Sequence, residues 1–147
     1  MISLLLIILA AFFNAVMDVL QFHYSISIFI KKSFDRFYWD PQYSWLNKYN
    51  NRTYADGLIK WGFMDKPACL TDAWHLSKTL MIFSLVGSII SFDYTYITLI
   101  TDLFQIANAF LYKVVHAFAY VFVFSLYGSI WIWTFNLFYN RWLIEKD

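Results

Sequence analysis

Polar side chains able to do chemistry recur at helical spacing in a chain that is otherwise strongly apolar. Asn14 and Asp18 are four residues apart, and Asp72, His75 and Lys78 follow one another at intervals of three. Residues with these spacings share one face of a helix. Carboxylate and imidazole groups bind zinc, iron or manganese, and they also act as general acids and bases. The spacing therefore predicts two polar helix faces that could support a metal site or proton transfer.

The first chemical hypothesis is a divalent metal site. Its predicted ligands are Asp18, Asp72 and His75, with His23 or His116 as a further candidate. Asp72 and His75 can point at one ion because they lie one helical turn apart. The chain lacks a pair of histidines four residues apart with a glutamate between them, which is a stronger metal signature. The competing interpretation is that Asp72 caps its helix and His75 hydrogen-bonds a neighbouring helix.

A related hypothesis is a membrane-embedded enzyme acting on a lipid-like substrate. In such an enzyme Asp18 and Asp72 would be general bases or metal ligands, and His75 would be a ligand or a proton carrier. Lys78 would anchor a phosphate or carboxylate group of the substrate. The predicted substrate-binding residues are Asn14, Trp74 and Lys78.

Three further interpretations assign other roles to these polar side chains or combine them with others. His75 and His116 could ligate haem, an option that we rank below the others. Asp18, Asp102 and His116 could form an ion or proton relay in an oligomer, as in a lysis-type protein. Finally, the polar faces could hold the helices together or dock a partner membrane protein, since interhelical polar contacts contribute about 0.6 kcal/mol each. We take this structural or accessory role as the primary hypothesis.

The composition excludes several classes of protein. Hydrophobic residues make up 61% of the 147 residues and charged residues 14%, and the mean hydropathy is +0.51. Soluble domains are about 45–50% apolar and about 25% charged, and small ones bury the least of their surface. A soluble enzyme and a disordered chain are therefore excluded. A formal net charge of +1 gives no basic field for nucleic acid, so the expected partners are the lipid bilayer and another membrane protein or a second copy.

The apolar runs predict an all-helical integral membrane protein with a single membrane domain. Residues 1–30 form a retained first span and its extension, because no basic residue precedes the run as a signal peptide requires. Residues 70–92 form a second span and 114–140 the last, since each can cross a hydrocarbon core of about 30 Å. Residues 94–112 are either an amphipathic helix along the membrane or an additional span, with the turn near Lys113. We favour three spans over four.

Residues 31–69 have a different composition from the apolar runs. They hold most of the basic residues and many of the tryptophans and tyrosines, a combination typical of the membrane–water boundary. The positive-inside rule places this interfacial loop in the cytoplasm and the N-terminus outside. With three spans Arg141 and Lys146 are cytoplasmic as well, whereas four spans place them outside.

Several segments resemble a group of small uncharacterised polytopic membrane proteins of bacteria and their phages. The segments are residues 10–18 (AAFFNAVMD), 39–41 (WDP), 44–49 (SWLNKY), 70–75 (LTDAWH) with Lys78, and 135–140 (FNLFYN). The resemblance extends over most of the chain. It implies that Asn14 and Asp18, the tryptophan-rich loop, and Asp72 and His75 belong to one constellation, and it implies no catalytic residue.

Overall fold

The computed structural model describes residues 2–49, 67–104 and 108–145, and its regular elements in these ranges are helices. Three of them are long and apolar enough to cross a membrane: α1 (Ile2–Phe22), α5 (Ala73–Ile90) and α7 (Ala109–Leu137). The π-helix η6 (Phe138–Leu143) continues α7 without a break. The predicted all-helical class is confirmed, with three candidate spans. Insertion into a bilayer stays a prediction.

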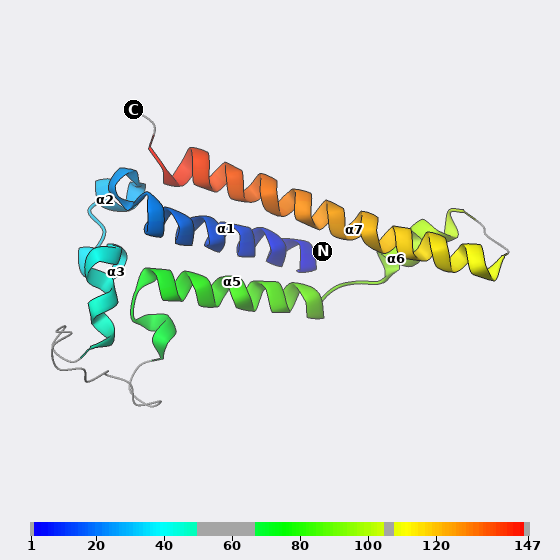
Figure 1. Ribbon diagram of the computed structural model, residues 1–147, viewed down its shortest axis with the longest axis horizontal. Helices are drawn as coiled ribbons and strands as arrows, with labels where there is room; N and C mark the ends of the chain where they lie inside the picture. Colours follow the sequence, from blue (N-terminus) through cyan, green and yellow to red (C-terminus); the bar gives the residue numbers. More distant parts are fainter. Residues whose placement is uncertain (1, 50–66, 105–107, 146–147) are drawn as a thin grey trace.

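The three long helices lie side by side, with α1 in the middle (Figure 1). Helix α5 runs antiparallel to α1, and α7 runs parallel to it. At one end the backbones of Ser27 and Ile144 form an antiparallel bridge. At the other end Ser88 Oγ donates to the Ser3 carbonyl at 3.0 Å, and the Ser3 and Tyr127 hydroxyls contact each other. The start of α1 is therefore fastened to α5 and α7, and the segment that follows α1 is fastened to the residue after η6.

Small side chains account for many of the buried positions on α1 and α5. The buried small residues are Ser3, Ala10, Ala11 and Ala15 on α1 and Ala73, Ser77, Ser84 and Ser88 on α5. A Cβ atom at Gly87 would lie only 3.1 Å from Leu6 Cδ1. Lipid tails are as apolar as leucine, so close packing of this kind is what favours helix association in a membrane.

Short helices follow α1 and close the end of the bundle at which α1 ends and α5 begins. They are η1 (Tyr24–Ile26), α2 (Ile28–Lys31), α3 (Arg36–Trp39), α4 (Pro41–Ser44) and η2 (Trp45–Lys48). Asp35 caps α3 by accepting from Phe37 N at 3.0 Å, and Asp40 caps α4 by accepting from Gln42 N at 2.9 Å. The predicted interfacial loop thus begins as short capped helices. Its residues 50–66 lie outside the described residues, and η5 (Ala68–Leu70) leads into α5.

The region between α5 and the last span differs from the prediction. Helix α6 (Thr95–Asp102) has 8 residues, which is too short to cross a membrane, so it is not a fourth span. The helix expected over residues 94–112 ends at Asp102, and α7 begins at Ala109 rather than at residue 114. The physical reason is a cap: Asn108 Oδ1 accepts from the backbone of Phe110 and Leu111. The expected turn position near Lys113 lies inside α7.

The last helix is much longer than its neighbours. Together α7 and η6 have 35 residues and a length of about 52 Å, against about 32 Å for the 21 residues of α1. Because the start of α1 is level with Tyr127, residues 109–126 extend past the bundle, and α6 packs along this extension (Figure 1). A small buried cluster of Ile97, Ala119 and Val123 joins α6 to α7.

Candidate functional site

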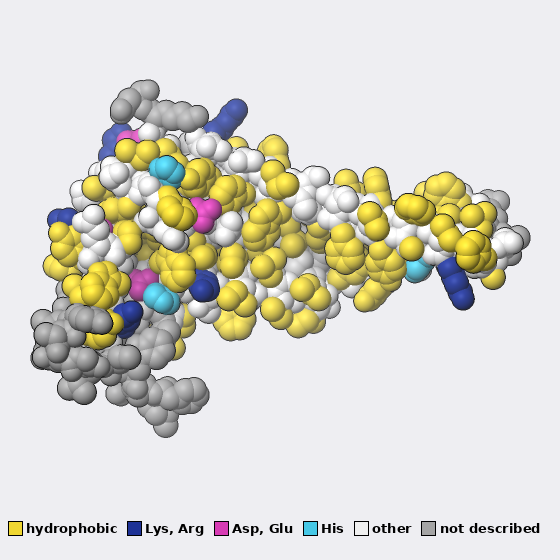
Figure 2. Space-filling view, viewed as in Figure 1, with side chains coloured by type: hydrophobic (Ala, Val, Ile, Leu, Met, Phe, Trp, Pro, Cys, Tyr) yellow, Lys and Arg dark blue, Asp and Glu magenta, His cyan; other side chains and the backbone are white. Residues whose placement is uncertain are grey.

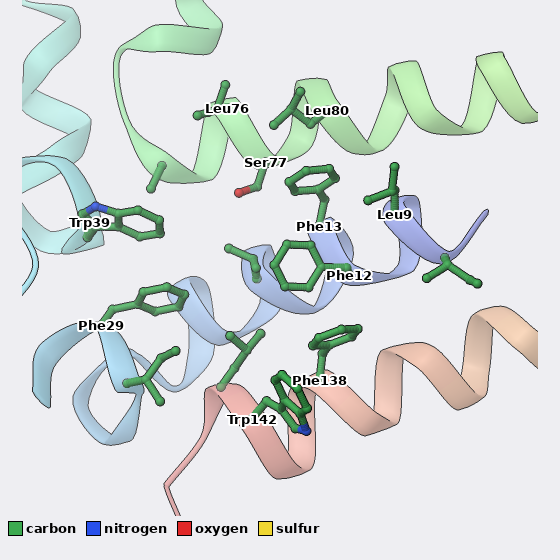
Figure 3. A pocket seen from close by; sticks show the side chains of 15 residues that line it. Leu9, Phe12, Phe13, Phe29, Trp39, Leu76, Ser77, Leu80, Phe138 and Trp142 are labelled. Carbon is green, nitrogen blue, oxygen red and sulfur yellow. The ribbon is translucent and has the colours of Figure 1, made fainter. Parts of the chain in front are cut away.

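An apolar cavity of about 590 Å³ lies between α1, α5 and η6, at the end of the bundle that the short helices close. Figure 3 shows rings from several elements around it: Phe12 and Phe13 from α1, Trp39 from α3, and Phe138 and Trp142 from η6. Apart from the hydroxyl of Ser77 and two indole N–H groups, the lining side chains are hydrocarbon. The cavity is partly open, so an apolar ligand could enter it from the surrounding medium.

Two helix faces form the walls of the cavity. On α1 the lining residues are Ile8, Leu9, Phe12, Phe13 and Val16, and on α5 they are Ala73, Leu76, Ser77 and Leu80. Intervals of three and four residues place each set on one helical face. Small residues that draw the two backbones together, such as Ala73 and Ser77, also lie on the cavity face, so helix packing and cavity shape depend on the same side chains.

Side chains of the short helices close one side of the cavity. We call this side, formed by Ile28, Phe29 and Trp39, the roof. The Phe29 and Trp39 rings stack with centroids 4.6 Å apart, and Phe34 packs against Trp39 at 5.1 Å. Phe29 is buried, and its neighbour Ile28 also lines the cavity. The roof is held in place by backbone contacts, because α2 begins directly after the bridge between Ser27 and Ile144.

The fourth side of the cavity is the π-helix. Phe138, Trp142 and Leu143 all line the cavity, and the rings of Phe138 and Trp142 are 5.5 Å apart. π-Helices are rare and frequently occur at functional sites. The unusual backbone of η6 therefore coincides with the cavity wall, which marks this end of the bundle as the functional candidate.

The sequence-predicted pair Asp72 and His75 is brought together at the start of α5. Asp72 Oδ1 accepts from His75 N at 2.9 Å, and Asp72 Oδ2 lies 2.7 Å from His75 Nδ1. Thr71 Oγ1 donates to the same Oδ2 at 3.2 Å, and Asn47 Nδ2 donates to the Thr71 carbonyl at 2.9 Å. The carboxylate can only accept, so His75 Nδ1 carries the proton. Both carboxylate oxygens are thus engaged in fixing the helix start.

Tyr38 extends this polar group toward α3. Burial is the main cause that raises the pKa of the Tyr38 hydroxyl, and the nearby Asp72 carboxylate and Cys69 thiol add to it. The phenol therefore remains neutral around pH 7, where it can donate a hydrogen bond but carries no charge. The prediction that Asp72 caps its helix is confirmed, whereas His75 bonds to that cap rather than to a neighbouring helix.

Asp18 and His23 belong to a different group of side chains. Asp18 is near enough to Tyr139 of η6 to interact with it electrostatically, and the His23 ring packs edge-on against Tyr139 at 5.6 Å. Within the described ranges no hydrogen bond or ion pair joins Asp18 to Asp72 or His75. The structure thus brings two of the predicted ligands together and leaves the third apart.

The predicted polar faces of α1 and α5 are turned away from the cavity. At 100° per residue, Asn14 and Asp18 lie on the side of α1 opposite Phe12 and Phe13. By the same reasoning His75 faces away from the cavity-lining side of α5. Figure 2 shows that most charged and histidine side chains on the visible face gather at the end that carries α2 and α3.

The predicted substrate-binding residues Lys78 and Trp74 contact each other. Lys78 Nζ lies 4.9 Å from the Trp74 ring centroid, a cation–π contact. The Trp74 ring also packs edge-on against His75 at 5.1 Å. Lys78 is exposed, and among the described residues it forms no ion pair with the carboxylate of Asp72.

Geometry also bears on metal and haem binding. In the part of the chain that the structure describes, no three His, Cys, Asp or Glu side chains are grouped so that they could hold a metal ion. His75 is at the start of α5, and His116 is on the extension of α7 beyond the opposite end of the bundle. The two histidines therefore cannot share one haem within a single chain.

Sequence reasoning missed the cavity because its residues are apolar. Phe12, Phe13 and Trp142 have the same character as side chains that face lipid, so nothing in their type or spacing distinguishes them. The small residues of α1 and α5 carry a readable signal, since Ala11 and Ala15, and Ser84 and Ser88, are spaced by four as in close-packed membrane helices. No family model, curated protein or solved structure matches the chain.

Proposed function

We propose that the chain is a multi-pass membrane protein with an accessory role, and that its three spans hold a lipid acyl chain in the apolar cavity. The cavity itself is the observation that carries the proposal. Its volume of about 590 Å³ falls in the usual range of ligand pockets, about 300–1,000 Å³. A nearly pure hydrocarbon lining selects an apolar occupant, and lipid chains are the most abundant apolar molecules around a membrane helix.

The proposed orientation follows from charge. With three spans, the described residues 31–49 and 67–69 lie at the same end of the bundle as Arg141. The positive-inside rule places this end in the cytoplasm and the N-terminus outside. Lys146 lies outside the described residues. The lipid chain would thus be held in the cytoplasmic leaflet.

Catalysis is less well supported than lipid binding. The Asp72 carboxylate is occupied by the helix start, and His75 is on the side of α5 turned away from the cavity. A relay of Asp18, Asp102 and His116 is also disfavoured within one chain, because Asp18 and His116 belong to opposite ends of the structure. His116 Nδ1 instead lies 3.1 Å from Thr101 Oγ1.

The test uses a matched pair of substitutions on α5. Leu80→Trp places a large ring in the cavity, whereas Ile82→Trp adds a similar volume at an exposed position of the same helix. Both proteins are purified in a mild detergent, and the phospholipid that each retains is counted by native mass spectrometry. The wild type and Ile82→Trp should retain a lipid, and Leu80→Trp should lose it. Circular dichroism checks that all three are folded.

Two results would contradict the proposal. A wild-type protein that carries no lipid would show that the cavity has no acyl occupant. Equal lipid retention by folded Leu80→Trp would show that any bound lipid lies elsewhere on the apolar surface.

A further inference from the structure

The basic residues of the segments that line the cavity suggest which kind of lipid is bound. This inference rests on the proposed binding of an acyl chain. We infer that the bound lipid is a phospholipid with an anionic headgroup, held by Lys32 and Arg141. These two residues belong to the segments that form the roof and the fourth side of the cavity, α2 with its C-cap and η6.

The first argument is that the neighbouring cations already have carboxylate partners. Lys31 Nζ lies 2.6 Å from Glu145 Oε1, and Arg36 Nε lies 2.9 Å from Asp40 Oδ2. Lys32 and Arg141 are exposed and have no ion pair or hydrogen bond from their side chains to any other described residue. They are therefore available to an external anion.

The second argument is position. The backbone N–H of Lys32 donates to the carbonyl of Ile28 at 3.0 Å, so Lys32 lies one helical turn beyond a residue that lines the cavity. Arg141 immediately precedes Trp142, another lining residue. The stems of lysine and arginine can follow apolar surface while their charged ends reach the headgroup level.

The third argument is that the two segments are fixed to each other. Besides the Lys31–Glu145 ion pair, Glu145 N donates to the Ile26 carbonyl at 3.0 Å, and Ser27 and Ile144 form their bridge between these contacts. Lys32 and Arg141 are thus carried on two segments that are fixed to each other, which reduces the ordering cost of binding a headgroup at this end of the bundle. The planar guanidinium of Arg141 suits bidentate contact with phosphate oxygens.

The experiment measures headgroup preference rather than lipid retention alone. The protein is placed in nanodiscs that contain equal amounts of phosphatidylglycerol and phosphatidylethanolamine, and the lipid that stays bound after release is identified by native mass spectrometry. The wild type should prefer phosphatidylglycerol by on the order of tenfold, since each basic residue near a membrane surface attracts anionic lipid. The double variant Lys32→Gln and Arg141→Gln should still bind a lipid but lose this preference.

The control Lys113→Gln and the cavity variant Leu80→Trp separate the proposal of headgroup preference from the proposal of acyl-chain binding. Lys113→Gln removes a cation of the α7 extension, at the other end of the structure, and should leave the preference unchanged. A double variant that keeps the wild-type preference, or a wild type that binds lipid with no preference, would overturn the inference while acyl binding stands. A wild type that retains no more lipid than Leu80→Trp would overturn both.

Discussion

Replacing Asp72 by alanine tests whether this carboxylate serves structure or chemistry. Loss of the N-cap bond from His75 N costs about 1 kcal/mol of stability. The side-chain bond between Asp72 and His75 adds about 0.5 kcal/mol, near the low end for a hydrogen bond, because the His75 side chain is 39% exposed. We therefore expect Asp72→Ala to lower the free energy of unfolding by about 1.5 kcal/mol.

Two further variants divide this effect between its parts. Asp72→Asn keeps an oxygen that can accept from His75 N, so it should cost less than the alanine variant. His75→Ala keeps the backbone cap and loses only the imidazole bond, about 0.5 kcal/mol. Val86→Ala, a change at an exposed position of the same helix, is the control and should have little effect.

The assay is unfolding by titration with SDS in a mild detergent, with helicity measured by circular dichroism. The expected order of stability loss is Asp72→Ala first, followed by Asp72→Asn and His75→Ala, with Val86→Ala last. The reasoning is refuted if Asp72→Ala unfolds at the same SDS fraction as the wild type. A carboxylate that is dispensable for stability would have to be explained by chemistry instead.

Two other predictions concern packing and pH. Gly87→Ile should lower stability relative to Gly128→Ile by about 1–3 kcal/mol in the same assay, because a side chain at Gly87 meets Leu6 whereas nothing lies within 4 Å at Gly128. Equal stability of the two isoleucine variants would show that α1 and α5 do not pack closely at this point. Burial raises the pKa of Tyr38 above its ordinary value of 10.0, so its contribution to stability is intact below that pH and is lost as the pH rises through the raised pKa. Tyr38→Phe should abolish this alkaline loss, and an unchanged pH profile in the variant would argue against it.

The sequence predicts the long apolar helices well where apolar length alone decides them. Residues 1–30 and 70–92 contain α1 and α5, and Asp72 caps α5 as one interpretation of the sequence expected. The predicted start of the last span at residue 114 is wrong, because no Gly or Pro near Lys113 marks a boundary and α7 begins at Ala109. A single side chain, Asn108, supplies the helix start instead.

The cavity could not be predicted, because it is a volume that side chains leave unfilled. Its shape depends on how close the small residues of α5, such as Ser77, bring the helix backbones together. It also depends on η6, where a wider helical turn directs both Phe138 and Trp142 to the same space. Neither the distance between two helices nor a change of helix type is encoded in residue type alone.

The polar residues that suggested catalysis take on a different meaning beside the cavity. Asp72 fixes the first turn of α5, where Ala73 already faces the cavity, and Asp40 fixes the junction of α3 and α4 next to Trp39 in the roof. Each carboxylate thus orients an element that contributes an apolar wall. Charged groups are costly at membrane depth, and they are placed here at the helix ends, where backbone N–H groups compensate them. If this interpretation holds, Asp72→Ala should weaken lipid retention only in proportion to its loss of stability, whereas Leu80→Trp should abolish retention in a protein that remains folded.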